Sequence, residues 1–364
     1  MAWLVRLFRW LLLKIPGVQR KHELRRRLEN EIDELRLKCA NLESELRGRN
    51  AQLAAVIEEA GAEAERLRSR SSQFEQELER ERRLLWARPG SSHSPIVAPD
   101  SREATRRCQA WSDGIEAVRL RDLNVRVDQE AMLDLFDRLR RHYPLLPFPE
   151  FSTPGRRYYY ENPFFSYADA ITMFGIVCEF RPRHLIEAGG DFSSLAFMDT
   201  IDARFEGAVD AVYFDTRRKG LLAALDPDDP CRTRVHSASV EEMPTELFRA
   251  LEANDILSLH TTHVGKTGSD VLDCLFRILP ALSPGVIVHL HDVFHPFEYP
   301  GAWIMEGRSW NELYFLRAFL QHNDRFEILY FNDWIYRKHV GMTGQYMPLC
   351  ARDTGSSLWL RTRQ

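Results

Sequence analysis

The stretch HLIEAGGDFSS, residues 184–194, decides the fold. It opens with a segment that we expect to be a buried strand, passes through Gly189 and Gly190, and reaches Ser193 and Ser194, which suit the start of a helix. Glycine permits a tight turn and lets a ligand approach the backbone closely. A buried strand, a glycine turn and a helix are typical of a parallel α/β sheet that binds a ligand at this turn. An ordinary strand-to-helix turn is the other interpretation.

The same alternation of short apolar runs and amphipathic stretches continues to the end of the chain. It predicts a parallel α/β sheet with helices between the strands, one of them at Gly268–Leu282. The expected strands are His184–Ala188, Val209–Phe214, Arg234–His236, Ile256–Leu259, Val286–Leu290, Phe326–Phe331 and Leu358–Leu360.

Polar side chains gather where these strands end. In open α/β sheets ligands bind beyond the carboxyl ends of the strands, so we expect a shared site there. Asp215 is placed to accept hydrogen bonds from ribose hydroxyls, although an aspartate in a solvent-facing turn would fit equally well. The polar residues at the predicted strand ends are Glu187, Asp215, His260, His263, His291 and Asp292.

Histidines follow two of the strands. His260 and His263 could supply a general base or a metal ligand, because imidazole titrates near neutrality and binds transition metals. His289 and His291 share a strand face, and Asp292 comes next, a combination that also suits a transition metal. Core histidines satisfied by the backbone are the alternative.

A long helix is predicted over residues 20–86. Apolar residues recur there in steps of three and four, with a slip near Gly61, and the other positions are dense in Glu and Arg. This is heptad spacing, so we expect a coiled coil and self-association, with a lone solvated helix as the alternative. The seam includes Leu28, Ile32, Leu35, Cys39, Leu42, Leu46, Leu53, Val56, Leu67, Phe74, Leu78 and Leu85.

The segment MAWLVRLFRWLLLKIPG, residues 1–17, mixes Trp, Phe and Leu with Arg and Lys. It lacks the small-residue cleavage site of a secretory signal and is too short and too charged for a membrane span of ~20 residues. A helix lying in an anionic membrane surface and a helix docking on a partner both fit it.

The composition excludes some classes of function. The formal net charge of −4 gives no reason to expect nucleic acid as a partner. Six cysteines at irregular spacing, with no CxxC pair, favour a reducing compartment without disulfides, hence the cytoplasm, with peripheral contact at the inner membrane if the first helix binds lipid. We expect an N-terminal helix at 1–17, a coiled coil at 18–87, a linker at 88–101, a helical lead-in at 102–150 and the α/β domain at 151–364.

Several blocks, in order, resemble a family of bacterial class I methyltransferases related to sugar and antibiotic O-methyltransferases. The resemblance covers roughly residues 150–340. It implies a seven-stranded, mostly parallel Rossmann-like sheet, S-adenosylmethionine as the methyl donor and a small-molecule or glycan hydroxyl as the acceptor. The blocks are RYYYENPFFSYADA (157–170), RPRHLIEAGGDFSS (181–194), HTTHVGKTGSDV (260–271), PGVIVHLHDVFHPFEYP (284–300) and EGRSWNELYFLRAFL (306–320).

The resemblance also implies roles for individual residues. His263 would remove the proton of the acceptor hydroxyl, and Asp292 would lie in the acceptor or metal site. Asp215 would hold the ribose. The residues expected around the cofactor are Glu187, Gly189, Gly190, Ser193 and Asp215, and those expected around a divalent metal are His260, His291 and Asp292.

Two residues depart from the family pattern. Asp191 stands where relatives tend to have glycine, and His260 stands where they tend to have aspartate. Exchanging a carboxylate for imidazole disfavours Mg²⁺ and favours a softer metal. The alternative function is therefore a catalytically degenerate scaffold that works through its coiled coil. An aromatic wall for the acceptor could come from Tyr158, Tyr159, Phe164, Phe165, His295 and Trp310, although core packing would also explain these residues.

Overall fold

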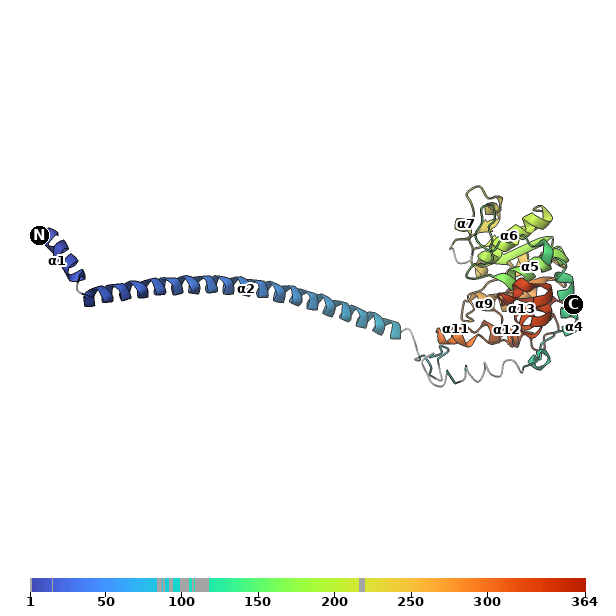
Figure 1. Cartoon of the computed structure of the whole chain (residues 1–364). Coiled ribbons are helices and arrows are strands. Elements are labelled where there is room, and N and C mark those ends of the chain that lie inside the picture. Colours follow the sequence, from blue (N-terminus) through green and yellow to red (C-terminus); the bar gives the residue numbers. More distant parts are fainter. Residues whose placement is uncertain are drawn as a thin grey trace. The chain divides into compact units, whose positions relative to one another are not determined.

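The computed structural model describes residues 2–14, 16–83, 87, 89–91, 94–98, 105–106, 108, 118–215 and 220–364 (Figure 1). The chain divides into two compact units, Met1–Arg88 and Pro89–Gln364. Residues 88, 92–93 and 99–101 of the predicted linker, most of the predicted lead-in before 118 and the seam residue Leu85 lie outside the described residues.

The first unit consists of helices α1 (Ala2–Leu13) and α2 (Pro16–Arg83). Pro16 opens α2, where the amide that proline lacks would have no helical partner in any case. The seam of α2 is exposed, with Ile32 at 47% and Leu46 at 60% of full exposure. The association of this seam with another chain stays a prediction. No helix among the described residues is long and apolar enough to cross a membrane.

The second unit is built on a seven-stranded sheet in the order β3-β2-β1-β4-β5-β7-β6. Strand β7 is antiparallel to both of its neighbours, β5 and β6, whereas the pairs among β1 to β5 are parallel. The predicted α/β, Rossmann-like fold is therefore confirmed. The strands are β1 (His184–Ala188), β2 (Asp210–Phe214), β3 (Val235–His236), β4 (Ile256–Leu259), β5 (Ile287–Leu290), β6 (Phe326–Phe331) and β7 (Leu358–Thr362).

Helices flank the sheet (Figure 1). Helix α5 packs against α4, α6 and α13, whereas α8 packs against the helical stretch that precedes β5. The α-helices of this unit are α4 (Gln129–Leu139), α5 (Tyr167–Phe180), α6 (Phe192–Phe205), α7 (Leu221–Ala224), α8 (Thr245–Arg249), α9 (Asp270–Asp273), α10 (Leu279–Ala281), α11 (Gly301–Met305), α12 (Glu312–Leu320), α13 (Asn332–Lys338) and α14 (Val340–Tyr346).

The helix predicted at Gly268–Leu282 is interrupted. It comprises α9, a π-helical turn at Cys274–Ile278 and α10. Pro280 lacks an amide hydrogen, and its ring would collide with the carbonyl four residues earlier, so a wider turn forms ahead of it. The predicted helix is therefore present over 270–281, with a π-helical turn inside it.

The predicted helical lead-in is only partly helical where it is described. Helix α4 buries Met132, Leu135 and Phe136, as its apolar pattern suggested. Ahead of it, Val125 and Val127 form β-bridges to Gln321 and Ile328. These residues therefore pack into the second unit through backbone pairing as well as through a helix face.

Candidate functional site

A cavity of about 1080 Å³ opens at the carboxyl edge of the sheet. Its walls come from the residues that follow β4 and β5, from the turn before α6, from the start of α5 and from the segment before β7. The volume lies near the upper end of the ~300–1,000 Å³ that is usual for small-molecule and cofactor pockets. The lining includes Asn162, Phe164, Asp169, Asp191, His260, His263, His291, Asp292, Phe294, Trp303, Arg308, Trp310, Arg352 and Ser356.

The structure brings together only part of the predicted site. His260, His263, His291 and Asp292 line the cavity, and so does Asp191. The residues expected around the cofactor do not line it: Glu187, Gly189, Gly190 and Ser193 lie behind its wall, and Asp215 follows β2, the strand next to β1.

His263 lies between two carboxylates. Its Nδ1 is 2.8 Å from Oε2 of Glu312, and its Nε2 is 3.4 Å from Oδ2 of Asp292. A carboxylate only accepts hydrogen bonds, so the contact with Glu312 favours a proton on Nδ1, and Nε2 faces Asp292. Thr261 donates to the same oxygen of Glu312. The ring also packs on Trp310, with centroids 4.3 Å apart, and is thus fixed on several sides.

Two residues of the site hold a left-handed backbone. His263 has φ +62° and Asp292 has φ +59°. Such conformations cost non-glycine residues ~1–3 kcal/mol and persist where surrounding contacts enforce them. At His263 those contacts are visible, because its carbonyl accepts the amides of Asn311 and Glu312. The strain turns both side chains into the cavity beyond β4 and β5.

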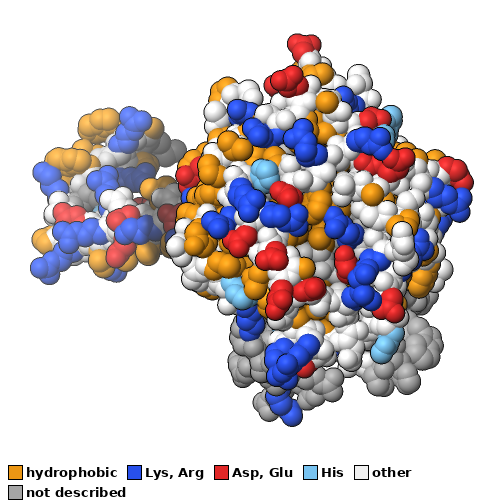
Figure 2. Space-filling view, turned by 90° about the vertical axis from the view of Figure 1, so that its right-hand side faces the viewer, with side chains coloured by type: hydrophobic (Ala, Val, Ile, Leu, Met, Phe, Trp, Pro, Cys, Tyr) orange, Lys and Arg blue, Asp and Glu red, His pale blue; other side chains and the backbone are white. Residues whose placement is uncertain are grey.

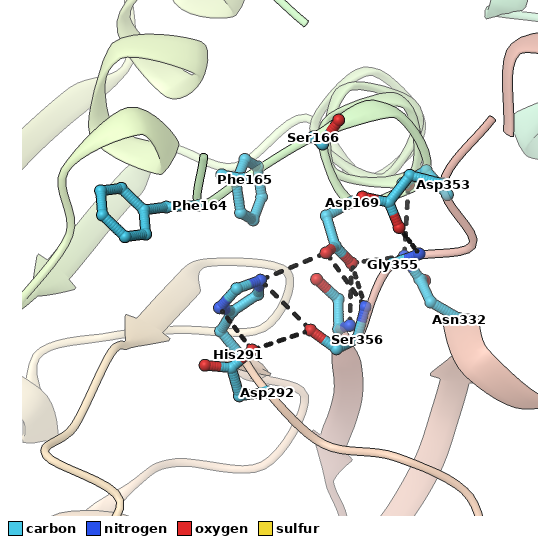
Figure 3. A network of polar contacts seen from close by, with 12 residues as sticks. Phe164, Phe165, Ser166, Asp169, His291, Asp292, Asn332, Asp353, Gly355 and Ser356 are labelled. Carbon is cyan, nitrogen blue, oxygen red and sulfur yellow. Dashed lines mark hydrogen bonds and ion pairs between the residues drawn. The ribbon is translucent and has the colours of Figure 1, made fainter. Parts of the chain in front are cut away.

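A buried charged network forms the cavity floor (Figure 3). Asp169 of α5 accepts the backbone amides of Ser356 and Ser357 at 2.8 to 3.0 Å, and its Oδ2 is 3.2 Å from Nε2 of His291. Nδ1 of His291 is 3.6 Å from Oδ1 of Asp292. Burial opposes the charge on His291, but Asp292 and Asp169 outweigh it and raise the pKa of His291 to about 9. Burial also opposes the charge on Asp169, yet His291 and the donors keep the pKa of that carboxyl below its usual range.

The expected metal site is not supported. Within the described part of the chain, no group of three or more His, Cys, Asp or Glu side chains could hold a metal ion. His291 is engaged by Asp169, and the rings of His260 and His291 pack against each other with centroids 5.1 Å apart. A protonated imidazole cannot donate a lone pair to a metal, so the raised pKa of His291 also disfavours this role.

His289 is a core residue. It bonds Ser258 through Nδ1 at 2.9 Å and Ser357 through Nε2 at 2.8 Å, and it stacks on Trp359. Burial lowers its pKa to about 3, with the charge of His291 as a second cause, so the ring is neutral. The interpretation as a core histidine agrees with this burial, but the partners are serine hydroxyls and not the backbone.

Glu187 is fully buried behind the glycine turn. Oγ of Ser193 donates to it at 2.7 Å, and Ser194 donates to its other oxygen. Burial raises the pKa of Glu187 to about 7, and these hydrogen bonds limit the rise. The two serines therefore satisfy a buried carboxyl group instead of capping the helix. The prediction of serine caps was wrong, because Asp191 is the N-cap of α6 and accepts the amide of Phe192.

Gly190 is required by this packing. A Cβ atom at this position would clash with the carboxyl carbon of Glu187, 2.4 Å away, and with Oγ of Ser194, 2.5 Å away. We expect Gly190→Ala to lower the free energy of unfolding of the second unit by about 1–3 kcal/mol through overpacking. Chemical denaturation measures this change. Gly344→Ala is the matched control: α14 leaves its Cβ position open, so it should be neutral or slightly stabilising.

Asp215 is held by the turn that follows it. Its Oδ2 accepts the amides of Gly220 at 3.1 Å and Leu221 at 3.4 Å, which orders the start of α7. Residues 216–219 lie outside the described part of the chain. A role of Asp215 in holding a ribose stays a prediction.

An aromatic and cationic wall lies beside His263. The guanidinium of Arg308 lies 4.2 Å from the ring centroid of Trp303 and 5.2 Å from that of Trp310. Phe294 packs edge-on against Trp303. Of the aromatic residues suggested for such a wall, Phe164 and Trp310 line the cavity, whereas Tyr158, Phe165 and His295 are buried in the core and Tyr159 packs on Phe192.

Sequence reasoning missed three residues of the site: Glu312, Asp169 and Arg308. All three belong to blocks that resemble the methyltransferase family, but none follows a predicted strand end. Glu312 and Asp169 lie in first turns of helices, and contacts across the fold bring them to the histidines. The sequence signal for Glu312 and Asp169 was an acidic residue in the first turn of a helix near the carboxyl edge of the sheet.

Comparison with known proteins gives remote matches. No family model matches the chain. A protein of Archaeoglobus fulgidus, itself described as uncharacterized, is 26% identical over 179 residues, which cover 46% of this chain and 75% of that one.

The solved structures that are similar to this chain include three methyltransferases. The Podospora anserina methyltransferase PaMTH1 with bound SAH has a TM-score of 0.34 and 15% identity, over 74% of this chain and 99% of that one. Human N-acetylserotonin methyltransferase with SAM has a TM-score of 0.27 and 12% identity, over 54% of this chain and 51% of that one. An O-methyltransferase family 2 protein of Planctomyces limnophilus with apigenin has a TM-score of 0.26 and 12% identity, over 74% of this chain and 63% of that one. At these scores the likenesses establish neither a family nor an activity for this chain.

Proposed function

We propose that the second unit is an S-adenosylmethionine-dependent O-methyltransferase. The observation that carries the proposal is His263, oriented by Glu312 and turned into a cavity at the carboxyl edge of a Rossmann-like sheet. An oriented imidazole in a pocket of this size is suited to removing a proton from a bound hydroxyl.

The residues near the glycine turn fit a cationic cofactor. S-adenosylmethionine would supply an electrophilic methyl group on a positively charged sulfonium, and it also carries an ammonium group. The carboxylate of Asp191 lines the cavity, where it is complementary to these charges. Gly189, with φ +85°, turns the chain from β1 toward Asp191. We therefore propose that Asp191 joins Gly189 and Gly190 in the cofactor region, with Asp215 beyond them and Glu187 and Ser193 supporting the turn from behind.

The chain's own contribution to the reaction is alignment and proton removal. His263 accepts the proton of the acceptor hydroxyl on Nε2, and the carboxylates of Glu312 and Asp292 stabilise the imidazolium that results. Asp292 also faces the acceptor region from the end of β5.

The acceptor region suits a sugar or another polyol. The indoles of Trp303 and Trp310 supply apolar surface for a sugar ring, while the guanidinium of Arg308 offers hydrogen-bond donors to hydroxyls. We propose a glycan-like hydroxyl compound as acceptor for these reasons.

We further propose that α2 self-associates as a coiled coil, since its apolar seam is exposed along its length. A cytoplasmic location fits the cysteines, all six of which are free thiols.

Asp191→Asn tests the cofactor region. The amide oxygen can still accept the amide of Phe192, so the cap of α6 survives while the charge is lost. We expect about tenfold weaker binding of S-adenosylmethionine in isothermal titration of the full chain, since a hydrogen bond to a charged group contributes ~1.5–3 kcal/mol. Asp228→Asn, an exposed aspartate that does not line the cavity, is the matched control. Equal affinity in both variants would place the cofactor away from Asp191.

A further inference from the structure

Helix α1 presents a broad apolar face to solvent. Trp3, Leu4, Phe8 and Leu11 are 72%, 63%, 69% and 51% exposed. Their spacing of one, three and four residues puts them on one side of the helix. Arg6 and Arg9, three residues apart, lie on the opposite side. Exposing this much tryptophan, phenylalanine and leucine to water is unfavourable, so the face requires a cover.

The charges on and beside α1 have one sign. Arg6, Arg9, Lys14, Arg20 and Lys21 precede the first acidic residue of the sequence, Glu23. Elsewhere the charges are mixed: α2 carries neighbouring ion pairs such as Arg25–Glu29, and the face of the second unit in Figure 2 shows basic and acidic side chains interspersed. The ammonium group of Lys14 also lies 3.9 Å from the ring centroid of Trp10, which keeps this cation next to the apolar face.

From these observations we propose that α1 is a membrane-surface helix that binds anionic lipid. It lies in the interface with its apolar face among the acyl chains and its cations at the headgroups. Tryptophan at the edge of the face suits the boundary between water and hydrocarbon. The twelve residues of α1 are too few to cross a bilayer that requires ~20, so the helix lies along the surface.

Lipid is favoured over a protein partner by the breadth of the face and by the charge. The apolar residues extend over more than half of the helix circumference, which matches a fluid hydrocarbon layer better than a groove on a folded protein. Each basic residue near an anionic membrane contributes roughly 1 kcal/mol, an attraction that neutral lipid lacks. The proposal is independent of the methyltransferase activity.

Vesicle co-sedimentation of the full chain tests it. Vesicles of phosphatidylcholine and phosphatidylglycerol at 3:1 should pellet the protein, and vesicles of phosphatidylcholine alone should pellet much less. Phe8→Glu should lower the partition coefficient at least tenfold, because it places a negatively charged carboxylate in the apolar face, where anionic lipid repels it. Leu37→Glu introduces the same change on an exposed position of α2 and should leave partitioning unchanged.

Arg6→Gln with Arg9→Gln separates charge from burial. It should weaken binding to the anionic vesicles by roughly ten- to thirtyfold and leave the weak binding to phosphatidylcholine unaltered, and 0.5 M salt should act in the same direction. Circular dichroism checks that the variants keep their helix. The proposal is overturned if anionic vesicles fail to pellet the wild-type chain, or if Phe8→Glu binds as well as Leu37→Glu; α1 would then be a docking helix for a protein.

Discussion

Replacing His263 by alanine should reduce methyl transfer by about 10²- to 10⁴-fold, the range that a general base contributes. The acceptor hydroxyl would then keep its proton, because Glu312 orients the imidazole of His263 and does not orient Asp292 in the same way. Affinity for S-adenosylmethionine should remain, because His263 is assigned to the acceptor and not to the cofactor. The measurement is transfer of the tritiated methyl group from S-adenosylmethionine to a panel of oligosaccharides.

Two further variants make this result specific. Glu312→Gln should lose less, roughly 10- to 100-fold, because the amide can still contact Nδ1 but no longer stabilises the imidazolium by its charge. His22→Ala, on the exposed surface of α2, should be fully active. If His263→Ala retains wild-type transfer, the base lies elsewhere in the cavity.

Replacing Asp169 by alanine should destabilise the second unit by about 3–5 kcal/mol, the cost of removing one partner of a buried ion pair. Asp169 is 4% exposed, and its carboxylate satisfies His291, two backbone amides and Nδ2 of Asn332. Alanine would leave these donors buried and unpaired. Denaturant unfolding of the full chain, followed by tryptophan fluorescence, reports the loss.

The pH dependence of stability gives this network a second signature. His291 has a folded pKa of about 9, above its usual 6.5, so its contribution is complete below pH 6.5 and is lost as the pH rises through 9. Asp169 has a folded pKa below its usual 3.8, so its contribution is present above that pH and is lost on acidification. The free energy of unfolding should therefore fall between pH 6.5 and 9.

Asp169→Asn should reduce this decline, since the amide accepts hydrogen bonds but carries no charge; the carboxylate of Asp292, which also raises the pKa of His291, remains. Asp324→Ala removes an aspartate of an exposed ion pair with Arg126 and should change stability by less than ~1 kcal/mol. An unchanged pH profile in Asp169→Asn would show that the pair does not hold the proton on His291.

The strands could be predicted because their signal is local. A short segment containing Leu185, Ile186 and Ala188, followed by two glycines, identifies β1, and the sheet follows from the repetition of such segments along the chain. The strand ends differed by one or two residues, as at Asp210 and Thr362, since pairing with the neighbouring strand sets the last hydrogen bonds. The π-helical turn ahead of Pro280 had a local signal, the proline itself, that the prediction of this helix did not use.

The site was harder to predict because its partners are distant in sequence. His263 and Asp292 could be found at strand ends, but Glu312 is 49 residues from His263, and Asp169 is 122 residues from His291. No spacing rule connects such pairs; only the packing of α5 and α12 does.

Titration of the full chain with S-adenosylmethionine tests the central claim most directly. Isothermal calorimetry should show saturable binding at one site per chain, with a dissociation constant well below about 1 mM, and Asp191→Asn should weaken it. No binding at millimolar cofactor would contradict the methyltransferase assignment and would favour a scaffold that retains the fold alone.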